Sequence, residues 1–415
     1  MGRVIVTVFC GRQDRTSILL GYLRRLCDAG KVDEVHLWDY CRQEADRRWL
    51  RGLGASLRYT APIDDYVGEV GLVGARMHRF RVQARTNARA LFVSEGGAEH
   101  ELFIGDRSCE FRAGNTILCP SRCALAPFPA WSDVVVSWTP TSTSVSVNGQ
   151  KPTSFERPRG FDPVKAFHSG DGCCWDIPAH TEPFLRYFSA EPHSVNKWRS
   201  YYRYYYDRRD SDFSDTIVIK CDDDVVAVDT EHFSDFVRFR EQNPQHLLVF
   251  PNIVNNGIAA FYQQQNGAIP KALMVLERPR TNGSLWESAA KCAALHSHFL
   301  SDPTRFAYDG FHVLEPPLRF SINFFAILPK DLVCFESVGD DDEHFLAVDT
   351  CVRLGRTKCV YNGMYVSHLS FFSQESGLDT ASLLASYEAL LDSSARRDKK
   401  NDVYNLSASV FALAI

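Results

Sequence analysis

Long hydrophobic runs are absent from this sequence of 415 residues. A membrane-spanning helix needs about 18 or more consecutive apolar residues, and no stretch of the chain reaches that length. The apolar run near the N-terminus, residues 4–10, is too short for a signal sequence or a membrane span. We therefore expect a cytoplasmic protein with no transmembrane segment.

A surplus of positive charge is missing as well. The formal net charge is -5, whereas binding to nucleic acid requires a basic surface that attracts phosphates. Nucleic acid is therefore not an expected partner. The composition, 45% hydrophobic and 23% charged, is that of an ordinary globular protein. The length allows two or three domains, each with its own core.

Cysteines are not arranged as zinc ligands, although the chain has 13 of them. Cys119 and Cys123 have no second pair at the spacing of a zinc site, and neither do the adjacent Cys173 and Cys174. An odd, scattered set of cysteines is typical of buried thiols in a reducing compartment.

The most informative stretch is an apolar strand pattern, residues 216–221, that runs directly into Asp222, Asp223 and Asp224. Three adjacent carboxylates cannot be buried without cationic partners, so we expect them at the open end of the strand. On an extended chain Asp222 and Asp224 point the same way. Oxygen ligands of this kind suit Mg²⁺ or Mn²⁺, which complete their shells with substrate phosphates. The alternative is a solvated acidic turn.

The flanking segments alternate between strand and helix patterns. Strands are predicted at residues 4–10 and 32–40, with helices at 18–26 and 42–53, and the same texture returns near residue 182. This alternation indicates an α/β domain. Ligands of such sheets bind at the carboxyl ends of the strands, which are here residues 9–12 and 39–40.

From about residue 66 to residue 175 the helical periodicity disappears. Short alternating runs, such as 101–105 and 134–138, are separated by glycine and proline turns. This pattern predicts an antiparallel β-sandwich, which either binds a ligand or is a structural insertion without one.

Three later features complete the pattern. Residues 195–206 combine tyrosines with Arg203 and predict a helix packed on a sheet, with nucleic-acid stacking as the alternative. A second acidic cluster, residues 340–343, predicts a loop that enters a helix, where acids also favour the positive helix N-terminus. His368 ends a predicted strand, where a histidine is either a ligand or a hydrogen-bonded structural residue.

In this order the parts resemble the GT-A glycosyltransferases, which transfer a sugar from a nucleotide-sugar donor. Residues 222–224 look like their DxD motif. The resemblance implies Mn²⁺ or Mg²⁺ held by Asp222 and Asp224, with His368 completing the shell. It also implies a donor site that includes Phe9, Cys10, Arg12, Asp39, Arg203, Lys220, Asp222 and Asp223.

The second acidic cluster is similar to the acidic loop of inverting GT-A enzymes. There a carboxylate takes the proton of the acceptor hydroxyl, while the metal neutralises the departing diphosphate. The resemblance implies that Asp342 or Glu343 is the base, with Asp341 as the fallback.

The predicted sandwich resembles the module named after farnesoic acid O-methyltransferase, which looks like a lectin-like binding domain. The resemblance rests on a Glu-x-x-Ile-Gly strand at 101–105, a Val-Ser-Trp strand at 136–138, and a closing Gly-x-Gly-x-x-Trp at 170–175.

The sequence thus predicts an α/β protein with a GT-A, Rossmann-like mixed sheet, helices on both faces, and an inserted antiparallel β-sandwich. The predicted parts are 1–62 (nucleotide-binding), 63–178 (sandwich), 179–390 (remainder of the catalytic domain) and 391–415 (tail). The expected activity is metal-dependent transfer from a nucleotide-sugar donor to a glycan or glycoprotein acceptor, with inversion. The alternatives are a carbohydrate-binding protein with a lapsed transferase domain, and a metal-dependent nucleotidyltransferase, for which no glycine-rich phosphate loop is visible.

Overall fold

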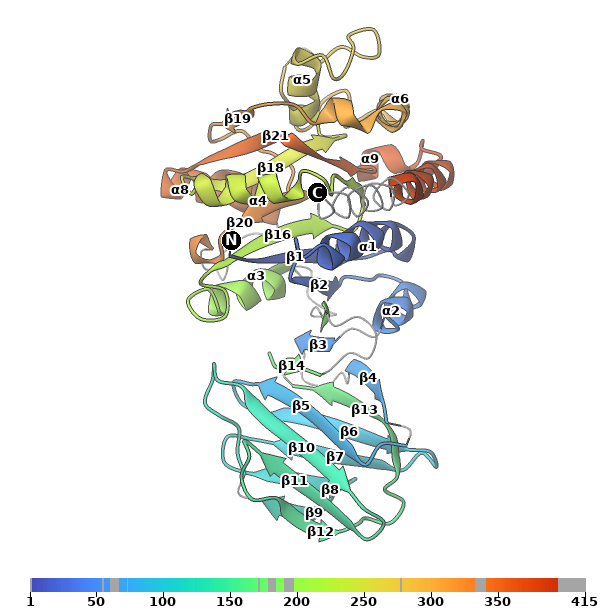
Figure 1. Cartoon of the computed structure of the whole chain (residues 1–415), viewed down its shortest axis with the longest axis vertical. Coiled ribbons are helices and arrows are strands. Elements are labelled where there is room, and N and C mark those ends of the chain that lie inside the picture. The colour runs from blue at the N-terminus through green and yellow to red at the C-terminus, as the bar shows by residue number, and fades with distance from the viewer. Residues whose placement is uncertain are drawn as a thin grey trace, which may run out of the picture. The chain divides into compact units, whose positions relative to one another are not determined.

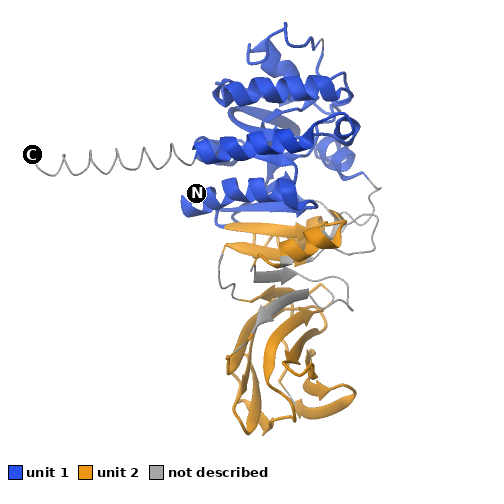
Figure 2. Ribbon diagram, turned by 90° about the vertical axis from the view of Figure 1, so that its right-hand side faces the viewer, with its two compact units in different colours: residues 1–33, 215–333, 337–415 blue, residues 34–214, 334–336 orange. Residues whose placement is uncertain are grey.

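The structure, a computed structural model (Figure 1), forms two compact units, coloured separately in Figure 2. Unit 1 comprises residues 1–33, 215–333 and 337–415, and unit 2 comprises residues 34–214 and 334–336. The residues that the structure describes are 2–53, 56–59, 67–72, 74–121, 123–170, 172–177, 184–189, 198–276, 278–332 and 341–394.

Unit 1 is built on a mixed sheet in which the strands follow the order β17-β21-β18-β20-β16-β1, with β19 paired to β21. The parallel pairs are β1 with β16 and β18 with β21, while β20 runs antiparallel to both β16 and β18. The strands are β1 (Arg3–Cys10), β16 (Thr216–Asp222), β17 (Val225–Val228), β18 (His246–Val254), β19 (Phe311–Leu314), β20 (Phe324–Ile327) and β21 (Thr357–His368).

The central strands are buried because their side chains are apolar on both faces, as parallel strands require. All nine residues of β18 are buried. The helices of unit 1 lie beside its strands (Figure 1). In α1, the apolar positions predicted from the helical periodicity, from Ile18 to Leu26, are buried. The helices are α1 (Gln13–Asp28), α4 (Phe233–Gln242), α5 (Gly257–Gln265), α6 (Ala289–Ser301), α7 (Asp342–His344), α8 (Cys351–Leu354) and α9 (Phe372–Glu375), and residues 380–394 are also helical.

Unit 2 contains a short parallel sheet in which β15 (Leu185–Ser189) lies between β2 (Glu34–Asp39) and β3 (Ser56–Tyr59). Its helices are α2 (Glu44–Arg51) and α3 (Trp198–Asp207). The ring of Trp38 packs against those of Phe188 and Tyr201, and Tyr201 and Tyr205 are buried. The tyrosines of α3 therefore form a core, which confirms the prediction of a helix packed on a sheet.

The remainder of unit 2 is the predicted antiparallel sandwich. One sheet has the order β12-β11-β10-β5-β14 and the other has the order β4-β13-β6-β7-β8-β9. Aromatic rings join the two, for example Phe80 to His168 and Phe111 to Phe155. The strands are β4 (Val67–Gly71), β5 (Met77–Gln83), β6 (Ala88–Ser94), β7 (Glu99–Ile104), β8 (Cys109–Ala113), β9 (Thr116–Ser121), β10 (Ser132–Trp138), β11 (Ser142–Val147), β12 (Thr153–Glu156), β13 (Pro163–Ser169) and β14 (Cys174–Asp176).

The two units divide the chain after residues 33 and 214, whereas the predicted parts meet at 62 and 178. The two units group residues by their contacts in space and do not test the predicted domain boundaries, which stay predictions. Most of the predicted tail, 395–415, lies outside the described residues. Among the described residues, no helix is both long enough and apolar enough to cross a membrane.

Arg208 attaches the end of α3 to the sandwich. Its side chain is buried and donates to Gln83 Oε1 and to Cys174 Sγ, each at 2.8 Å. The guanidinium also lies 4.4 Å from the centre of the Tyr204 ring. Gln83 and Cys174 belong to β5 and β14, which pair with each other. A single cation thus links the helix to two neighbouring strands.

We predict that Arg208→Leu lowers the free energy of unfolding by about 2–4 kcal/mol, because it leaves buried polar groups without partners. Arg203→Leu is the matched control. Arg203 is 58% exposed and, among the described residues, forms an ion pair with Asp207 alone, so this change should alter stability by less than about 1 kcal/mol. Urea unfolding measures both values, and equal losses in the two variants would contradict the role given to Arg208.

Candidate active site

The three consecutive aspartates lie where β16 ends. Asp222 is the last residue of β16, residues 223 and 224 form a turn, and β17 begins at Val225. The expectation that Asp222 and Asp224 share a direction on extended chain was wrong, because the chain turns between them. The parallel pairing of β1 with β16 sets Phe9 beside Asp222. Residues 9–12 and 222–224 therefore meet, as predicted.

Arg12 holds Asp223 with two hydrogen bonds. Arg12 Nε is 3.1 Å from Asp223 Oδ2, and Nη2 is 2.8 Å from Oδ1. The backbone N–H of Gly11 also donates to Oδ2, at 3.0 Å. Burial raises the pKa of Asp223, although Arg12 opposes this. With both of its oxygens bound by the protein, Asp223 serves to position the loop after β1.

Lys220 and Asn323 hold Asp222. Lys220 is buried, and its Nζ donates to Asp222 Oδ1 and to the carbonyl of Ile322. Asn323 Nδ2 donates to Asp222 Oδ2 at 3.2 Å. Burial would lower the pKa of Lys220, but the charges of Asp222 and Asp342 raise it on balance. Lys220 therefore stays charged, and its Nζ lies 4.8 Å from the centre of the Phe9 ring.

Asp224 faces His368. The antiparallel pairing of β17 with β21 sets Val225 opposite His368, and His368 Nε2 lies 3.3 Å from Asp224 Oδ1. On its other oxygen, Asp224 accepts from Arg12 Nη2 at 3.1 Å. Burial would raise the pKa of Asp224, but His368, Arg12 and Arg15 lower it well below its usual range. Asp224 is therefore ionised at neutral pH.

The fit of these residues to a divalent cation depends on which of their atoms lack partners. Asp224 Oδ1 and His368 Nδ1 are buried and form no hydrogen bond with a described residue, although Asp224 Oδ1 faces His368 Nε2 at 3.3 Å. A carboxylate oxygen facing an imidazole suits Mn²⁺, whereas Asp222 would first have to exchange Lys220 for the metal. Among the described residues, no group of three or more His, Cys, Asp or Glu side chains is arranged to hold a metal. Asp224 and His368 are the residues of this edge that would hold a divalent cation, which stays a prediction.

The second acidic loop enters a helix, as predicted. Asp341 caps α7 by accepting from the backbone N–H of His344 at 2.9 Å. Arg319 binds both oxygens of Asp341, at 2.9 and 3.2 Å, and also binds Glu343. Burial raises the pKa of Glu343, against the opposing effect of Arg319. Asp341 and Glu343 are therefore structural here, whereas the charge of Asp342 acts on Lys220.

The remaining predicted donor residues have other surroundings. Asp39 and Arg203 lie in unit 2. Asp39 accepts from the Tyr187 hydroxyl at 2.5 Å and from the backbone N–H of Cys41 at 3.1 Å. Cys10, at the end of β1, is buried, and its thiol contacts the carbonyl of Val8.

Sequence analysis missed four residues of this site. Arg15 lies 3.9 Å from Asp224, and Glu375 accepts from both Arg12 and Arg15 at 3.0 Å. A signal for Arg15 existed, because residues three apart share a helix face and Arg12 immediately precedes α1. No local pattern marked Glu375, Asn323 or Arg319, whose partners lie far away in the sequence.

Comparisons with known proteins give little beyond this geometry. No protein-family model and no curated protein matches the chain. Among solved structures, a carbohydrate-binding module from Bacillus subtilis aligns with 5% identity over 28% of this chain and 81% of that one, at a TM-score of 0.24. A galectin from Caenorhabditis elegans aligns with 12% identity over 30% and 94%, at 0.23, and sheep galectin-11 with 14% over 28% and 98%, at 0.22.

We predict that Arg319→Gln destabilises the protein by about 1–3 kcal/mol at pH 7, because the half-buried Glu343 loses its counter-charge. The loss of Arg319 should raise the pKa of Glu343 further. The destabilisation is complete above that pKa and fades as the pH is lowered from 7 into the acid range, since a protonated Glu343 needs no counter-ion.

Thermal unfolding across this pH range measures the effect. Arg305→Gln, which breaks an exposed pair with Asp302, is the control and should show little change. A difference between wild type and Arg319→Gln that stays constant with pH would contradict the assignment.

Proposed function

We propose that this protein is a metal-dependent glycosyltransferase of the GT-A type, which transfers a sugar from a nucleotide-sugar to a hydroxyl of a glycan or glycoprotein. The observation that carries the proposal is the convergence of Asp224, His368 and Arg12 at the carboxyl ends of β1 and β16. A mixed sheet with this acidic edge supports it, because ligands of α/β sheets bind at such edges.

In this proposal Asp224 and His368 hold Mn²⁺ or Mg²⁺, and Asp222 joins them when Lys220 turns to the substrate. The metal would counter the charge of the leaving diphosphate. Lys220 and Arg12 are the cations of this chain that would contact the phosphates. Both already lie against carboxylates, so they are charged and positioned before the donor arrives.

Asp342 is the proposed base of an inverting reaction. Of the three candidate acids, Asp341 and Glu343 are bound by Arg319, and an arginine salt bridge makes a carboxylate a weaker base. Asp342 lies near enough to Lys220 for its charge to act on that side chain. We therefore assign the base to Asp342, whose neighbours in the loop are anchored by Arg319.

A second candidate function is that of a carbohydrate-binding protein whose transferase domain has lapsed. One observation favours it: Lys220, Asn323 and Arg12 already satisfy the oxygens of Asp222 and Asp223, so two of the three acids need no metal. Measured turnover separates the two candidates.

We predict that Asp224→Asn and His368→Gln each weaken Mn²⁺-dependent binding of a nucleoside diphosphate by roughly 10–100-fold. Asp235→Asn, at an exposed pair with Arg238, should leave it unchanged. Calorimetric titration of nucleotide with and without Mn²⁺ measures the effect. Asp222→Asn is less diagnostic, because it also strips the buried Lys220 of its counter-ion. Undiminished metal-dependent binding in both test variants would remove the metal assignment.

We further predict inversion at the anomeric carbon. Proton NMR of the product formed from an α-linked donor should show a β linkage, and Asp342→Asn should lower kcat by roughly 10²–10⁴ with little change in donor affinity. Glu343→Gln, which changes a residue bound by Arg319, should lower kcat far less. An α-linked product would contradict both the mechanism and the role of Asp342.

A further inference from the structure

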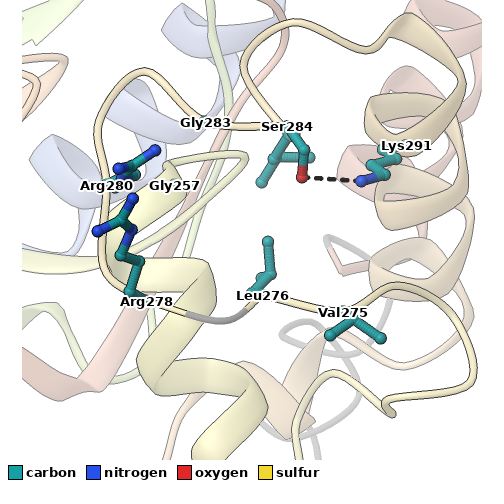
Figure 3. A pocket seen from close by; sticks show the side chains of 9 residues that line it. Gly257, Val275, Leu276, Arg278, Arg280, Gly283, Ser284 and Lys291 are labelled. Carbon is teal, nitrogen blue, oxygen red and sulfur yellow. Dashed lines mark hydrogen bonds between the residues drawn. The ribbon is translucent and has the colours of Figure 1, made fainter.

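Unit 1 contains a cavity of about 390 Å³ beside the N-terminus of α5. Figure 3 shows Arg278 and Arg280 on one side of it and Lys291, from α6, on the other. Its volume lies within the range of small-molecule sites, about 300–1,000 Å³.

The described charged residues that line this cavity all carry positive charge. Arg278, Arg280 and Lys291 line it, and no described acidic residue does. Neither arginine forms an ion pair or a side-chain hydrogen bond with a described residue, and Lys291 Nζ donates to Ser284 Oγ at 2.8 Å. Clustered cations repel one another unless an anion joins them. Arginine and lysine bind carboxylate, sulfate and phosphate groups through charge-assisted hydrogen bonds.

The lining of the cavity also includes apolar side chains, which suit a ligand larger than a free ion. Val275, Leu276 and Leu285 line it together with the cations. Apolar side chains can pack on the carbon-bearing face of a sugar, while the cations take an anionic substituent. Such a mixture of apolar walls with a few polar groups is typical of sites for small organic molecules.

Gly257 fixes the loop that carries Arg280. A Cβ atom at this first residue of α5 would lie 2.2 Å from the backbone oxygen of Arg280. Only glycine therefore allows the loop to pack this closely on the helix start. The position of Arg280 at the cavity is thus built into the backbone and does not depend on its side chain alone.

A buried hydrogen-bond network joins the cavity to the acidic site. Gln374 Nε2 donates to the carbonyl of Leu285, at the cavity wall, at 2.7 Å. Gln374 also bonds to Asn255, whose Nδ2 donates to the carbonyl of Leu369, next to His368. Glu375, the residue after Gln374, binds Arg12 and Arg15. Hydrogen bonds through Gln374 and Asn255 therefore connect the cavity wall to the segment that carries His368 and Glu375.

We propose that this cavity binds an anionic substituent of the acceptor, a carboxylate, sulfate or phosphate group carried on a sugar. Arg278, Arg280 and Lys291 bind the anion, and the apolar wall packs against the sugar. The assignment as an acceptor site rests on the proposed glycosyl transfer, whereas the affinity for the anion does not.

The first test is calorimetric titration of the full chain, at low ionic strength, with inorganic phosphate, inorganic sulfate and methyl glucuronide. At least one of them should bind, and Arg278→Gln combined with Arg280→Gln should weaken it about ten- to a hundredfold. The matched control is Lys271→Gln combined with Lys330→Gln, which removes the same charge from two exposed residues outside the cavity. Absence of binding by all three probes, or an equal loss in both double variants, overturns the proposal.

The second test compares anionic and neutral acceptors in sugar transfer. The arginine double variant should raise KM for the anionic acceptor about tenfold or more, with donor hydrolysis and neutral-acceptor KM unchanged. If donor hydrolysis is absent from wild type, the proposed transfer fails, while the titration still decides the anion site. If the anion binds but KM for the anionic acceptor does not change, the acceptor role is wrong.

Discussion

Three consecutive carboxylates at the end of a buried strand are the constraint on which unit 1 depends. A desolvated carboxylate without a cation costs several kcal/mol, so Asp222, Asp223 and Asp224 need partners from the surrounding elements. Lys220 comes from β16 itself, Arg12 and Arg15 from the start of α1, and His368 from the end of β21. The ends of β1, β16 and β21 therefore come together at the acids, where each cation pairs with one or two of them.

The three acids differ in what holds them, and this difference organises their chemistry. Asp223 is bound on both oxygens by Arg12 and a backbone N–H, so it serves the loop. Asp222 is held by Lys220 and Asn323, and its negative charge raises the pKa of Lys220. Of the three, only Asp224 has an oxygen that forms no hydrogen bond with a described residue, and this oxygen faces the His368 imidazole. Adjacent residues of one type can thus have three roles, each set by the partner that the fold supplies.

Sequence patterns located the elements better than they located the contacts between them. Apolar periodicity correctly placed β1, α1, β16 and the sandwich strands, because each depends on local burial. The assumption of extended chain failed at residues 223–224, where the backbone forms a turn between β16 and β17. Asn323 and Glu375 could not be found, because their partners lie 101 and up to 363 residues away and no local rule records such pairs. The capping role of Asp341 was foreseeable from the run of acids before a helix.

The net charge of the whole chain does not predict which small ions bind at a single cavity. The net charge of -5 describes the electric field far from the protein. It argues against the binding of a polyanion, because a polyanion must contact a wide area of the surface. At physiological ionic strength that field is screened within about 8 Å, so a small anion responds to the charges around it. Arg278, Arg280 and Lys291 face one cavity without a described acid among its lining residues. The same chain can therefore repel nucleic acid and still attract a single carboxylate or sulfate, because the two depend on charge at different distances.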